Sequence, residues 1–379
     1  MRCRYFESSI CQSCALLPMT YEQSIAIRFA ALQRLFPFTP LEEFVPVSQT
    51  IGSRIRAKLA VSGTTEHPEF GFWDDQRSLV AVERCPLHHP AINAFTVPLR
   101  RLITDARLMP YDVENDRGEL KFVVLTWSPS AEQMMVQLVL RSRESVDRIV
   151  SSWKRYKVDS WSQVAVLSIN LQPARSSQIA GDEDIGISDE QRLPIRFGST
   201  ELLFGPKSFL QTNYEIATAL YARVASELRT QGTKSLLDLY CGVGAFSLSA
   251  GTDIQSVVGI DISENAIDNA KSAATINRRK NASFLCQSLN SSVNPDQFSS
   301  QSFDTVICNP PRRGLDAPGM DLIRRTQPVH LIYSSCNPVT LQRDVSLLEH
   351  DFQLQKLIPF DMFPFTHHCE VLALLKRKA

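Results

Sequence analysis

The run DLYCGVGAFS, from Asp238 to Ser247, places an acidic residue and two glycines where an apolar strand gives way to a helix. Glycines at such a turn let the backbone bend tightly and approach a ligand closely. Asp261 ends the next apolar strand, VVGID, where a carboxylate can accept both ribose hydroxyls of a nucleoside. The two motifs together predict a nucleotide-type pocket, although simple turn geometry would explain the glycines alone.

Outward from this turn, residues 206 to 379 alternate helix-forming stretches with short apolar runs such as SLLDLY, SVVGID, FDTVICN and HLIYSS. This alternation predicts a parallel sheet covered by helices on both faces, with ligands beyond the carboxyl ends of the strands. The fourth strand ends in NPPRRG, from Asn309 to Gly314, a proline-stiffened loop at that edge. A dinucleotide site would carry a third glycine where Ser247 stands. The motifs together therefore favour S-adenosylmethionine as the ligand.

The preceding residues, 41 to 205, form short alternating runs separated by turn signals, including RIRAKLAVSG, GELKFVVLTWS and QVAVLSINLQP. This pattern predicts an antiparallel, β-rich region. The polar, glycine-containing stretch PARSSQIAGDEDIGISDE fits a surface hairpin or loop better than core.

Forty Lys and Arg residues balance forty Asp and Glu residues, so the protein as a whole has no general attraction for nucleic acid. Local contacts could come from Arg54, Arg56 and Lys58 on one predicted strand face, with Arg117 and Lys121 nearby. An ordinary solvated strand face explains this alternation equally well. No apolar run approaches the roughly 20 residues needed to span a bilayer, and no secretory signal is present, so we expect a cytoplasmic protein.

Nine cysteines in a reducing compartment are better explained as ligands, a nucleophile or small buried residues than as disulfides. Cys336 follows the apolar strand HLIYSS within the run SSCNP, at the edge where the pocket is predicted. Cys286 and Cys308 lie in or beside apolar strands, and we expect them to be packed and inert. Burial alone does not exclude Cys241 or Cys369. The residues by themselves leave Cys336 balanced between a nucleophile and a structural thiol.

The run NPPRRG, followed after sixteen residues by LIYSSCNPVT from Leu331 to Thr340, resembles the signature of RNA uridine C5-methyltransferases. The resemblance implies that Cys336 is the nucleophile, that Asn337 shapes a uracil pocket and that Asn309, where some relatives carry Asp, lies near the methyl donor. The chemistry requires a thiol, because C5 of uracil is a poor nucleophile until a thiolate adds at C6. The target uridine would have to be flipped into the pocket.

The stretch DMFPFTHHCE, from Asp361 to Glu370, is similar to the second signature of this family and implies that Glu370 removes the C5 proton. Phe365 and Cys369 depart from that signature, because a polar or tyrosyl residue and a larger apolar residue are usual there. The alternative is that Glu370 merely solvates an edge strand, EVLALL.

The pentapeptide FLQTN, at residues 209–213, is uninformative by itself. The same resemblance places it at the entrance of the catalytic domain, where Gln211 would contact the cofactor alongside Tyr240 and Asp261. With Asn309, these residues form the expected S-adenosylmethionine site.

Cys3, Cys11 and Cys14 form a C-x7-C-x2-C run, and Cys85 follows far downstream in a Cys-Pro pair. By spacing, four thiolates suit zinc and an iron-sulfur cluster equally, and unrelated cysteines are a third reading. The resemblance favours a [4Fe-4S] cluster with a structural or RNA-positioning role, because the reaction needs no electron transfer. A cluster at the start of the chain without a preceding OB-like (TRAM) domain is similar to the bacterial 23S rRNA (uracil-C5)-methyltransferases.

The expected fold is α/β, with a Rossmann-like methyltransferase domain over 205–379 preceded by a β-rich N-terminal region. Within that region we expect the iron-sulfur cluster over 1–90 and a central RNA-binding part over 91–204. The expected activity is formation of 5-methyluridine in 23S rRNA by a monomer that does not contact a membrane. Rival hypotheses are methylation of a uridine in another RNA such as tRNA, a base amino-group methyltransferase, and a noncatalytic iron-sulfur RNA-binding protein. The amino-group enzymes usually carry an aromatic residue where Arg312 stands.

Overall fold

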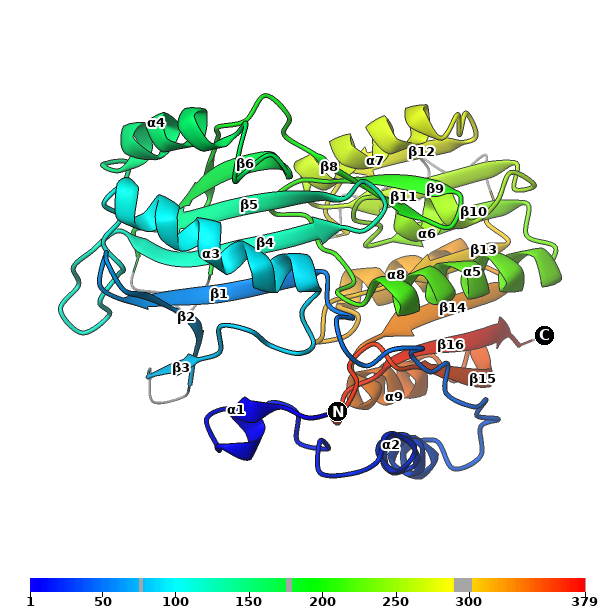
Figure 1. The fold of residues 1–379 in the computed structure, drawn as a ribbon. Coiled ribbons are helices and arrows are strands. Elements are labelled where there is room, and N and C mark those ends of the chain that lie inside the picture. Colours follow the sequence, from blue (N-terminus) through cyan, green and yellow to red (C-terminus); the bar gives the residue numbers. More distant parts are fainter. Residues whose placement is uncertain (75–77, 175–178, 290–301, 379) are drawn as a thin grey trace. The chain divides into compact units, whose positions relative to one another are not determined.

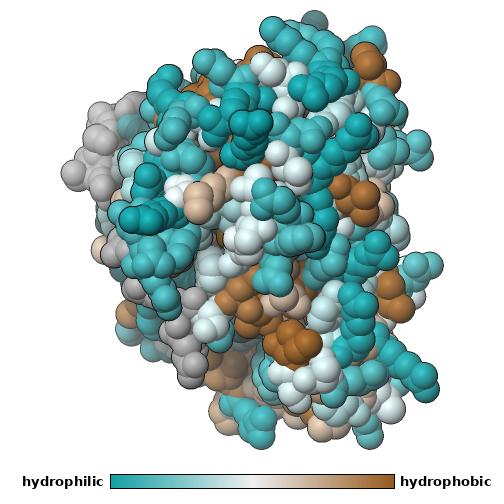
Figure 2. All heavy atoms as spheres, turned by 60° about the vertical axis from the view of Figure 1, so that its left-hand side comes forward, coloured by the Kyte–Doolittle hydropathy of each residue, from teal (hydrophilic) through white to brown (hydrophobic). Residues whose placement is uncertain are grey.

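The computed structural model describes residues 1–74, 78–174, 179–289 and 302–378, and it contains two compact units (Figure 1). Unit 1 comprises Met1–Ser13 and Gln49–Ile195, and unit 2 comprises Cys14–Ser48 and Arg196–Ala379. Among the helices in the described ranges, none combines the length and apolar character needed to cross a membrane. The face drawn in Figure 2 is mainly hydrophilic and carries small apolar clusters.

Unit 1 is built on one seven-stranded sheet. Its strands are β1 (Arg56–Gly63), β2 (Pro68–Trp73), β3 (Leu79–Ala81), β4 (Leu120–Ser128), β5 (Gln133–Leu140), β6 (Val164–Leu171) and β7 (Glu183–Gly186), in the order β3-β2-β1-β4-β5-β6-β7. Its helices are α1 (Arg4–Glu7), α3 (Pro90–Asp105) and α4 (Val146–Tyr156). Neighbouring strands are antiparallel except for β5 and β6, which are parallel and joined through α4. The predicted β-rich region is present, with this one parallel pair as the exception.

The polar stretch at residues 173–190 is not entirely a loop. It contains β7, which pairs with β6 at the edge of the sheet. Residues 175–178 of this stretch lie outside the described residues. The prediction of a surface hairpin is thus confirmed for β7, because this mostly exposed strand runs antiparallel to the preceding strand β6.

Unit 2 contains a second seven-stranded sheet, with helices packed around it (Figure 1). Its strands are β10 (Ser235–Leu239), β11 (Ser256–Asp261), β12 (Ala282–Cys286), β13 (Thr305–Cys308), β14 (His330–Ser335), β15 (Phe352–Phe360) and β16 (Glu370–Arg377), in the order β12-β11-β10-β13-β14-β16-β15. Its helices are α2 (Tyr21–Leu35), α5 (Tyr214–Thr230), α6 (Ala245–Ser249), α7 (Glu264–Ile276), α8 (Ala317–Thr326) and α9 (Pro338–Leu347). A separate two-stranded sheet pairs β8 (Leu193–Phe197) with β9 (Thr200–Phe204).

The first five strands of this order are parallel, as the alternating helix and strand pattern predicts. All four residues of β13 are buried, because helices cover both faces of the sheet centre. The expected Rossmann-like α/β domain is therefore confirmed.

Strand β16 runs antiparallel to β14 and lies between β14 and β15. Because of this direction, β16 begins at the same edge of the sheet at which β14 ends, and Ser335 pairs with Val371 there. The residues that follow β14 and the residue that opens β16 are consequently neighbours. Cys336 and Glu370 occupy those two positions.

Helix α2, near the start of the chain, completes unit 2. A capping box opens it, since Thr20 and Gln23 each accept a hydrogen bond from the backbone amide of the other. Its Arg28 is buried and donates to Asp361 Oδ1 at 2.5 Å, while Tyr21 donates to Asp361 Oδ2 at 2.7 Å. Leu32 of the same helix belongs to the hydrophobic core of the sheet. The helix thus fastens the β15–β16 connection.

We expect Arg28→Ala to lower the free energy of unfolding by about 3–5 kcal/mol, because it leaves a buried carboxylate without its cation. Urea unfolding of the full chain measures the change. Arg34→Ala, at an exposed position of the same helix, is the matched control and should cost under about 1 kcal/mol. Equal stability of the two variants would contradict the role given to the ion pair.

Candidate active site

A cavity of about 610 Å³ lies beyond the carboxyl ends of the parallel strands of unit 2. Its walls come from the glycine turn after β10, the end of β11, the loop after β13 and the turn after β14. The structure brings all six residues proposed for cofactor binding and catalysis to this one cavity: Gln211, Tyr240, Asp261, Asn309, Cys336 and Glu370.

Asp261 is held at the cavity by backbone donors. Its Oδ2 accepts from the Gly242 amide at 2.9 Å, and its Oδ1 accepts from the Ser263 amide at 2.9 Å. A carboxylate has about four lone-pair sites, so acceptor capacity remains for a ligand. The glycine turn is tight here, because a Cβ on Gly244 (φ +78°) would lie 2.9 Å from the Phe284 ring.

Asp238, the acidic residue of the glycine motif, has a structural role. It is fully buried, and its Oδ2 accepts from the amide of Ser247 at 3.1 Å and from its hydroxyl at 2.5 Å. Burial raises the pKa of Asp238 to about 7, against the opposing effect of the Ser247 hydrogen bonds. Ser247, which replaces the third glycine of a dinucleotide motif, therefore fixes this turn.

Tyr240 follows β10 in the left-handed backbone region, with φ of 60°. Such a conformation is uncommon for a bulky residue and is found mainly where the surrounding structure enforces it. The Tyr240 hydroxyl donates to Asp316 Oδ1 at 2.7 Å. Asp316 Oδ1 also accepts from the Gly319 amide, at the start of α8, at 3.0 Å. The side chain is thus fixed between the glycine turn and the loop after β13.

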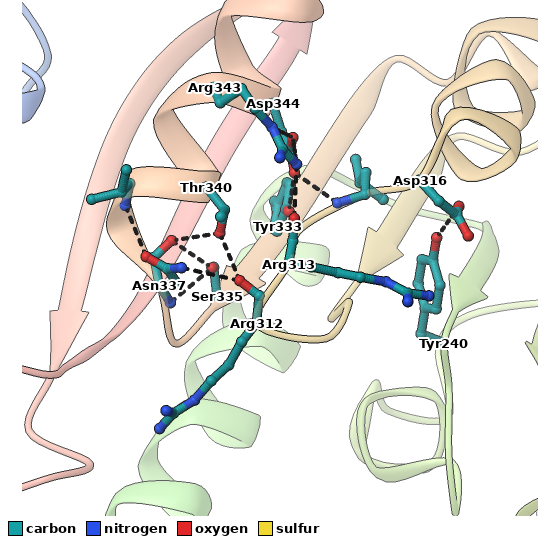
Figure 3. A network of polar contacts seen from close by, with 12 residues as sticks. Tyr240, Arg312, Arg313, Asp316, Tyr333, Ser335, Asn337, Thr340, Arg343 and Asp344 are labelled. Atoms are coloured by element: carbon teal, nitrogen blue, oxygen red, sulfur yellow. Dashed lines mark hydrogen bonds and ion pairs between the residues drawn. The ribbon is translucent and has the colours of Figure 1, made fainter. Parts of the chain in front are cut away.

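The loop after β13 and the turn after β14 are joined by hydrogen bonds (Figure 3). The Arg312 carbonyl oxygen accepts from Asn337 Nδ2 at 3.0 Å and from the Thr340 hydroxyl at 3.2 Å. The Arg313 carbonyl oxygen accepts from the Arg343 guanidinium at 2.8 Å. These contacts attach the loop after β13, which contains Asn309, to the turn after β14, which contains Cys336.

Asp344 of α9 links the same segments from within the protein (Figure 3). Its side chain is fully buried, and its Oδ2 accepts from the Leu315 amide at 2.7 Å and from the Tyr333 hydroxyl at 2.6 Å. Gly314 leaves room for this carboxylate, since a Cβ at this position, where φ is +84°, would collide with Asp344 Oδ2. Arg343 donates to the other oxygen.

Cys336 is half-buried at the cavity, directly before α9. Burial and then the Glu370 charge raise the pKa of its thiol, whereas a hydrogen bond and the positive charge of Arg312 act in the opposite direction. The N-terminus of α9 also favours a thiolate. Arg312 is therefore the cation that partly offsets the rise in the Cys336 pKa.

The remaining cysteines of unit 2's sheet region differ in exposure. Cys241, Cys308 and Cys369 are buried, and burial raises the pKa of each well away from a reactive value. The prediction that Cys286 is packed is wrong, because it is exposed at the end of β12, the outermost strand of the sheet. An apolar strand pattern does not show whether the strand lies at an edge.

Glu370 is buried, with 1% of its surface exposed, and it lines the cavity. Its Oε1 accepts from the Ser334 hydroxyl, and its Oε2 has no hydrogen-bond partner among the described residues. Burial raises the pKa of Glu370 to about 7, and the Ser334 hydrogen bond opposes that shift. The alternative that Glu370 solvates an edge strand is wrong, because β16 lies between two other strands.

The two departures from the second signature are packing residues. Phe365 is buried, has a positive φ of 58° and contacts the Tyr21 ring edge to face, with centroids 6.0 Å apart. Its carbonyl oxygen accepts from the Leu16 amide at 2.9 Å. Cys369 is 2% exposed and packs in the core cluster. Both therefore help to seat the N-terminal part of unit 2 beside the strand that carries Glu370.

The motifs did not indicate a role for three residues: Arg312 and Tyr221 line the cavity, and Ser334 hydrogen-bonds to Glu370. Arg312 was considered only as a missing aromatic, and Ser334 only as part of a signature. Tyr221 of α5 lines the cavity, and burial together with the charges of Glu370 and Asp238 raises the pKa of its hydroxyl. A helical pattern of apolar residues gives no indication that one aromatic faces a ligand pocket.

The four N-terminal cysteines are each half-buried. Cys3, Cys11 and Cys85 belong to unit 1, and Cys14 opens the second segment of the chain, in unit 2. In the part of the chain that the structure describes, no group of three or more His, Cys, Asp or Glu side chains is arranged to hold a metal ion. The predicted cluster site is therefore not found among the described residues.

The candidate nucleic-acid face is partly present. Arg54, Arg56 and Lys58 alternate with buried apolar neighbours, as predicted, although burial lowers the pKa of Arg56 to about 10. Arg117 is exposed. The prediction for Lys121 is wrong, because it is 5% exposed, donates to the Ala174 carbonyl at 2.9 Å and lies over the Tyr111 ring. Its long apolar stem explains why strand alternation alone misplaced it.

The sheet order, the glycine turn and the cavity at the strand ends together define a methyltransferase with a Rossmann-like fold. A model of the family described as tRNA (Uracil-5-)-methyltransferase matches residues 20–378. The chain therefore belongs to this family of RNA uracil-5-methyltransferases.

Relatives match along nearly the whole chain. The 23S rRNA (uracil(747)-C(5))-methyltransferase RlmC of Shewanella amazonensis is 35% identical, covering 100% of this chain and 98% of the relative. The RlmC of Vibrio vulnificus is 34% identical, covering 100% of both. Among solved structures, the tRNA (uracil-54, C5)-methyltransferase of Pyrococcus abyssi in complex with S-adenosyl-L-homocysteine has a TM-score of 0.79 and 26% identity, covering 96% of this chain and 85% of that one.

We expect Gly314→Ala to reduce methyl transfer at least about tenfold. The added Cβ would displace the Asp344 carboxylate, which joins the loop after β13 to β14. Initial rates with labelled cofactor measure the loss. Gly232→Ala is the matched control, since Gly232 also has positive φ but a Cβ added there would meet no atom of the described residues within 4 Å. It should cost about 1–2 kcal/mol of stability and leave the rate unchanged. Equal rates in the two variants would remove the argument for a steric constraint at Gly314.

Proposed function

We propose that this protein transfers a methyl group from S-adenosylmethionine to C5 of a uridine in 23S rRNA, at the position named in its RlmC relatives. The observation that carries the proposal is the meeting of Cys336 and Glu370 at the cavity that also contains Asp261 and Asn309. A thiol, a carboxylate and a nucleoside-type pocket are the groups that the reaction requires. A protein whose substrate is ribosomal RNA works where ribosomes are assembled, so we expect it in the cytoplasm.

The cavity fits S-adenosylmethionine by its donor set and its walls. Asp261 would accept from the ribose hydroxyls, and the exposed apolar side chains of Phe209 and Ile262 would flank the adenine. Gln211, Tyr240 and Asn309 would contact the remainder of the molecule. When bound, the cofactor supplies an electrophilic methyl group. All other chemistry falls to residues of this chain.

Cys336 acts first in the proposed reaction. Its thiolate, favoured by Arg312 and by the N-terminus of α9, adds to C6 of the uracil and makes C5 nucleophilic. C5 then bonds to the methyl group as the methyl–sulfur bond of the cofactor breaks, which leaves S-adenosylhomocysteine. Asn337 holds the Arg312 backbone, so the nucleophile and its cation stay together.

Glu370 completes the reaction by removing the C5 proton. The electron pair of the C5–H bond then restores the C5–C6 double bond, and the Cys336–C6 bond breaks to return the thiolate. The raised pKa of Glu370, about 7, suits a group that accepts a proton and later releases it near neutral pH. The low exposure of Glu370 keeps water away from the acceptor.

We expect Glu370→Gln to form a complex with a 23S rRNA transcript that survives denaturing electrophoresis, because the adduct forms and is not resolved. The rate at which the adduct is resolved to free product should fall by about 10²–10⁴-fold. Cys336→Ala should form no such complex and lose at least about 10³-fold in turnover. Cys286→Ala, at an exposed cysteine outside the cavity, is the control and should behave as wild type.

A tRNA transcript tested in parallel separates the two RNA classes represented among the relatives. Methylation of tRNA but not of 23S rRNA would correct the substrate and keep the chemistry. Full turnover by Cys336→Ala would end the covalent mechanism.

We further propose that Cys3, Cys11, Cys14 and Cys85 hold a [4Fe-4S] cluster. Soft thiolates in this number are the usual donor set of such clusters. Burial raises the pKa of the Cys85 thiol, and the backbone amides of Leu87 and His88 oppose that rise by favouring the thiolate, which is the form that binds a cluster.

Iron analysis of protein purified without oxygen tests this second proposal. We expect about four iron atoms per chain in the wild type and less than half of that in Cys85→Ser. Cys286→Ser should retain the wild-type content. Unchanged iron content in Cys85→Ser, or no iron in the wild type, would reject the cluster.

A further inference from the structure

Ser334 stands at a position that the proposed reaction has not used so far. It is the fifth residue of β14, two residues before Cys336, and its side chain is fully buried. Its hydroxyl donates to Glu370 Oε1 at 2.5 Å. Its strand partner in the register is Leu372, two residues after Glu370. The hydrogen bond therefore spans two paired strands at the edge where the cavity opens.

The two oxygens of Glu370 are in different situations. Oε1 is engaged by Ser334, whereas Oε2 is buried and has no hydrogen-bond partner in the described ranges of the chain. A buried carboxylate oxygen without a partner is costly and occurs mainly where function requires it. Glu370 lines the cavity together with Cys336, so this oxygen is the one left to meet a substrate.

We infer that Ser334 is a positioning residue for Glu370: it fixes Oε1 so that Oε2 receives the C5 proton. Strand β14 then supplies both the nucleophile, at its end, and the group that orients the base. This inference rests on the function proposed above, and it gives the two carboxylate oxygens of Glu370 different roles in that reaction.

Removal of the proton by Glu370 rearranges the bonds at C5, at C6 and at the Cys336 sulfur. The C5–H bond breaks, its proton goes to Oε2, its electron pair forms the C5–C6 double bond, and the Cys336–C6 pair returns to sulfur. Ser334 keeps its hydrogen bond to Oε1 throughout. Because a hydroxyl binds a carboxylate more strongly than the neutral acid, Ser334 holds down the pKa that burial raises.

The pKa of Glu370 determines how the rate of adduct resolution changes with pH. Glu370 must be ionised to accept the proton, so resolution of the adduct becomes faster as the pH rises through the pKa of Glu370. Without the Ser334 hydroxyl, that pKa rises, and the midpoint of the rate profile moves to higher pH. Addition of Cys336 to the ring does not need the base and should be much less affected.

The pair Ser334→Thr and Ser334→Val provides the test, because Thr and Val have nearly equal volume and differ in the hydroxyl. Single-turnover reactions with 23S rRNA transcript between pH 6 and 9 would follow adduct and 5-methyluridine separately. We expect Ser334→Val to accumulate adduct, resolve it about tenfold more slowly at pH 7 and shift the midpoint by about one pH unit upward. Ser334→Thr should retain the wild-type midpoint, and KM for the cofactor should change less than about twofold in both.

Ser334→Ala gives a smaller side chain in case both larger residues disturb the strand, and it should behave as Ser334→Val does. Thr305→Val is the matched control. Thr305 has a buried hydroxyl that shares a 2.8 Å hydrogen bond with Thr233, in the same sheet but at its opposite edge. It should lower stability and leave the pH profile unchanged.

Wild-type pH profiles in folded Ser334→Val and Ser334→Ala would overturn the inference while the proposed function stands. Absence of 5-methyluridine with the wild-type protein would instead reject the proposed function, and the role of Ser334 would fall with it. A shift of equal size in Thr305→Val would show a general effect of lost stability and would also overturn the inference.

Discussion

The carboxylate of Asp344 is the contact on which the candidate active site depends. It is buried and accepts at once from the amide of the loop after β13, from the Tyr333 hydroxyl of β14 and from Arg343 of its own helix. A buried charge is tolerated only when its oxygens are satisfied, so these three segments have one common arrangement. Gly314 has no side chain because this arrangement leaves no space for one.

Sheet topology then brings the reacting groups together. In an all-parallel sheet the strand beside β14 would end at the cavity, and a residue at its start would lie at the far edge. The antiparallel direction of β16 reverses this and places Glu370, its first residue, beside the end of β14. The reversed direction of β16 thus places a carboxylate next to a thiol at the cavity. With parallel strands alone, that carboxylate would have to come from a loop.

Local patterns were sufficient for the Rossmann-like domain and for placing Asp261, Asn309 and Cys336 at one site, because each follows or ends a strand and strand ends converge. Gln211, Tyr240 and Glu370 were predicted only from the family resemblance. Local patterns were insufficient where a role depends on distant partners. Nothing near Arg28 or Asp361 shows that the two side chains meet, and Ser334 shows its role only once Glu370 is across from it. Edge position exposed Cys286, and a flexible stem let Lys121 turn inward, which no strand pattern records.

The two segments of unit 2 are far apart in the order of synthesis. Arg28 precedes Asp361 by 333 residues, so at about 5–20 residues per second α2 waits roughly 20–70 s on the ribosome for its partner. A chain interrupted anywhere before β16 lacks Glu370 at the cavity, whatever else has already folded. The candidate active site is therefore completed only after β16 has been synthesised.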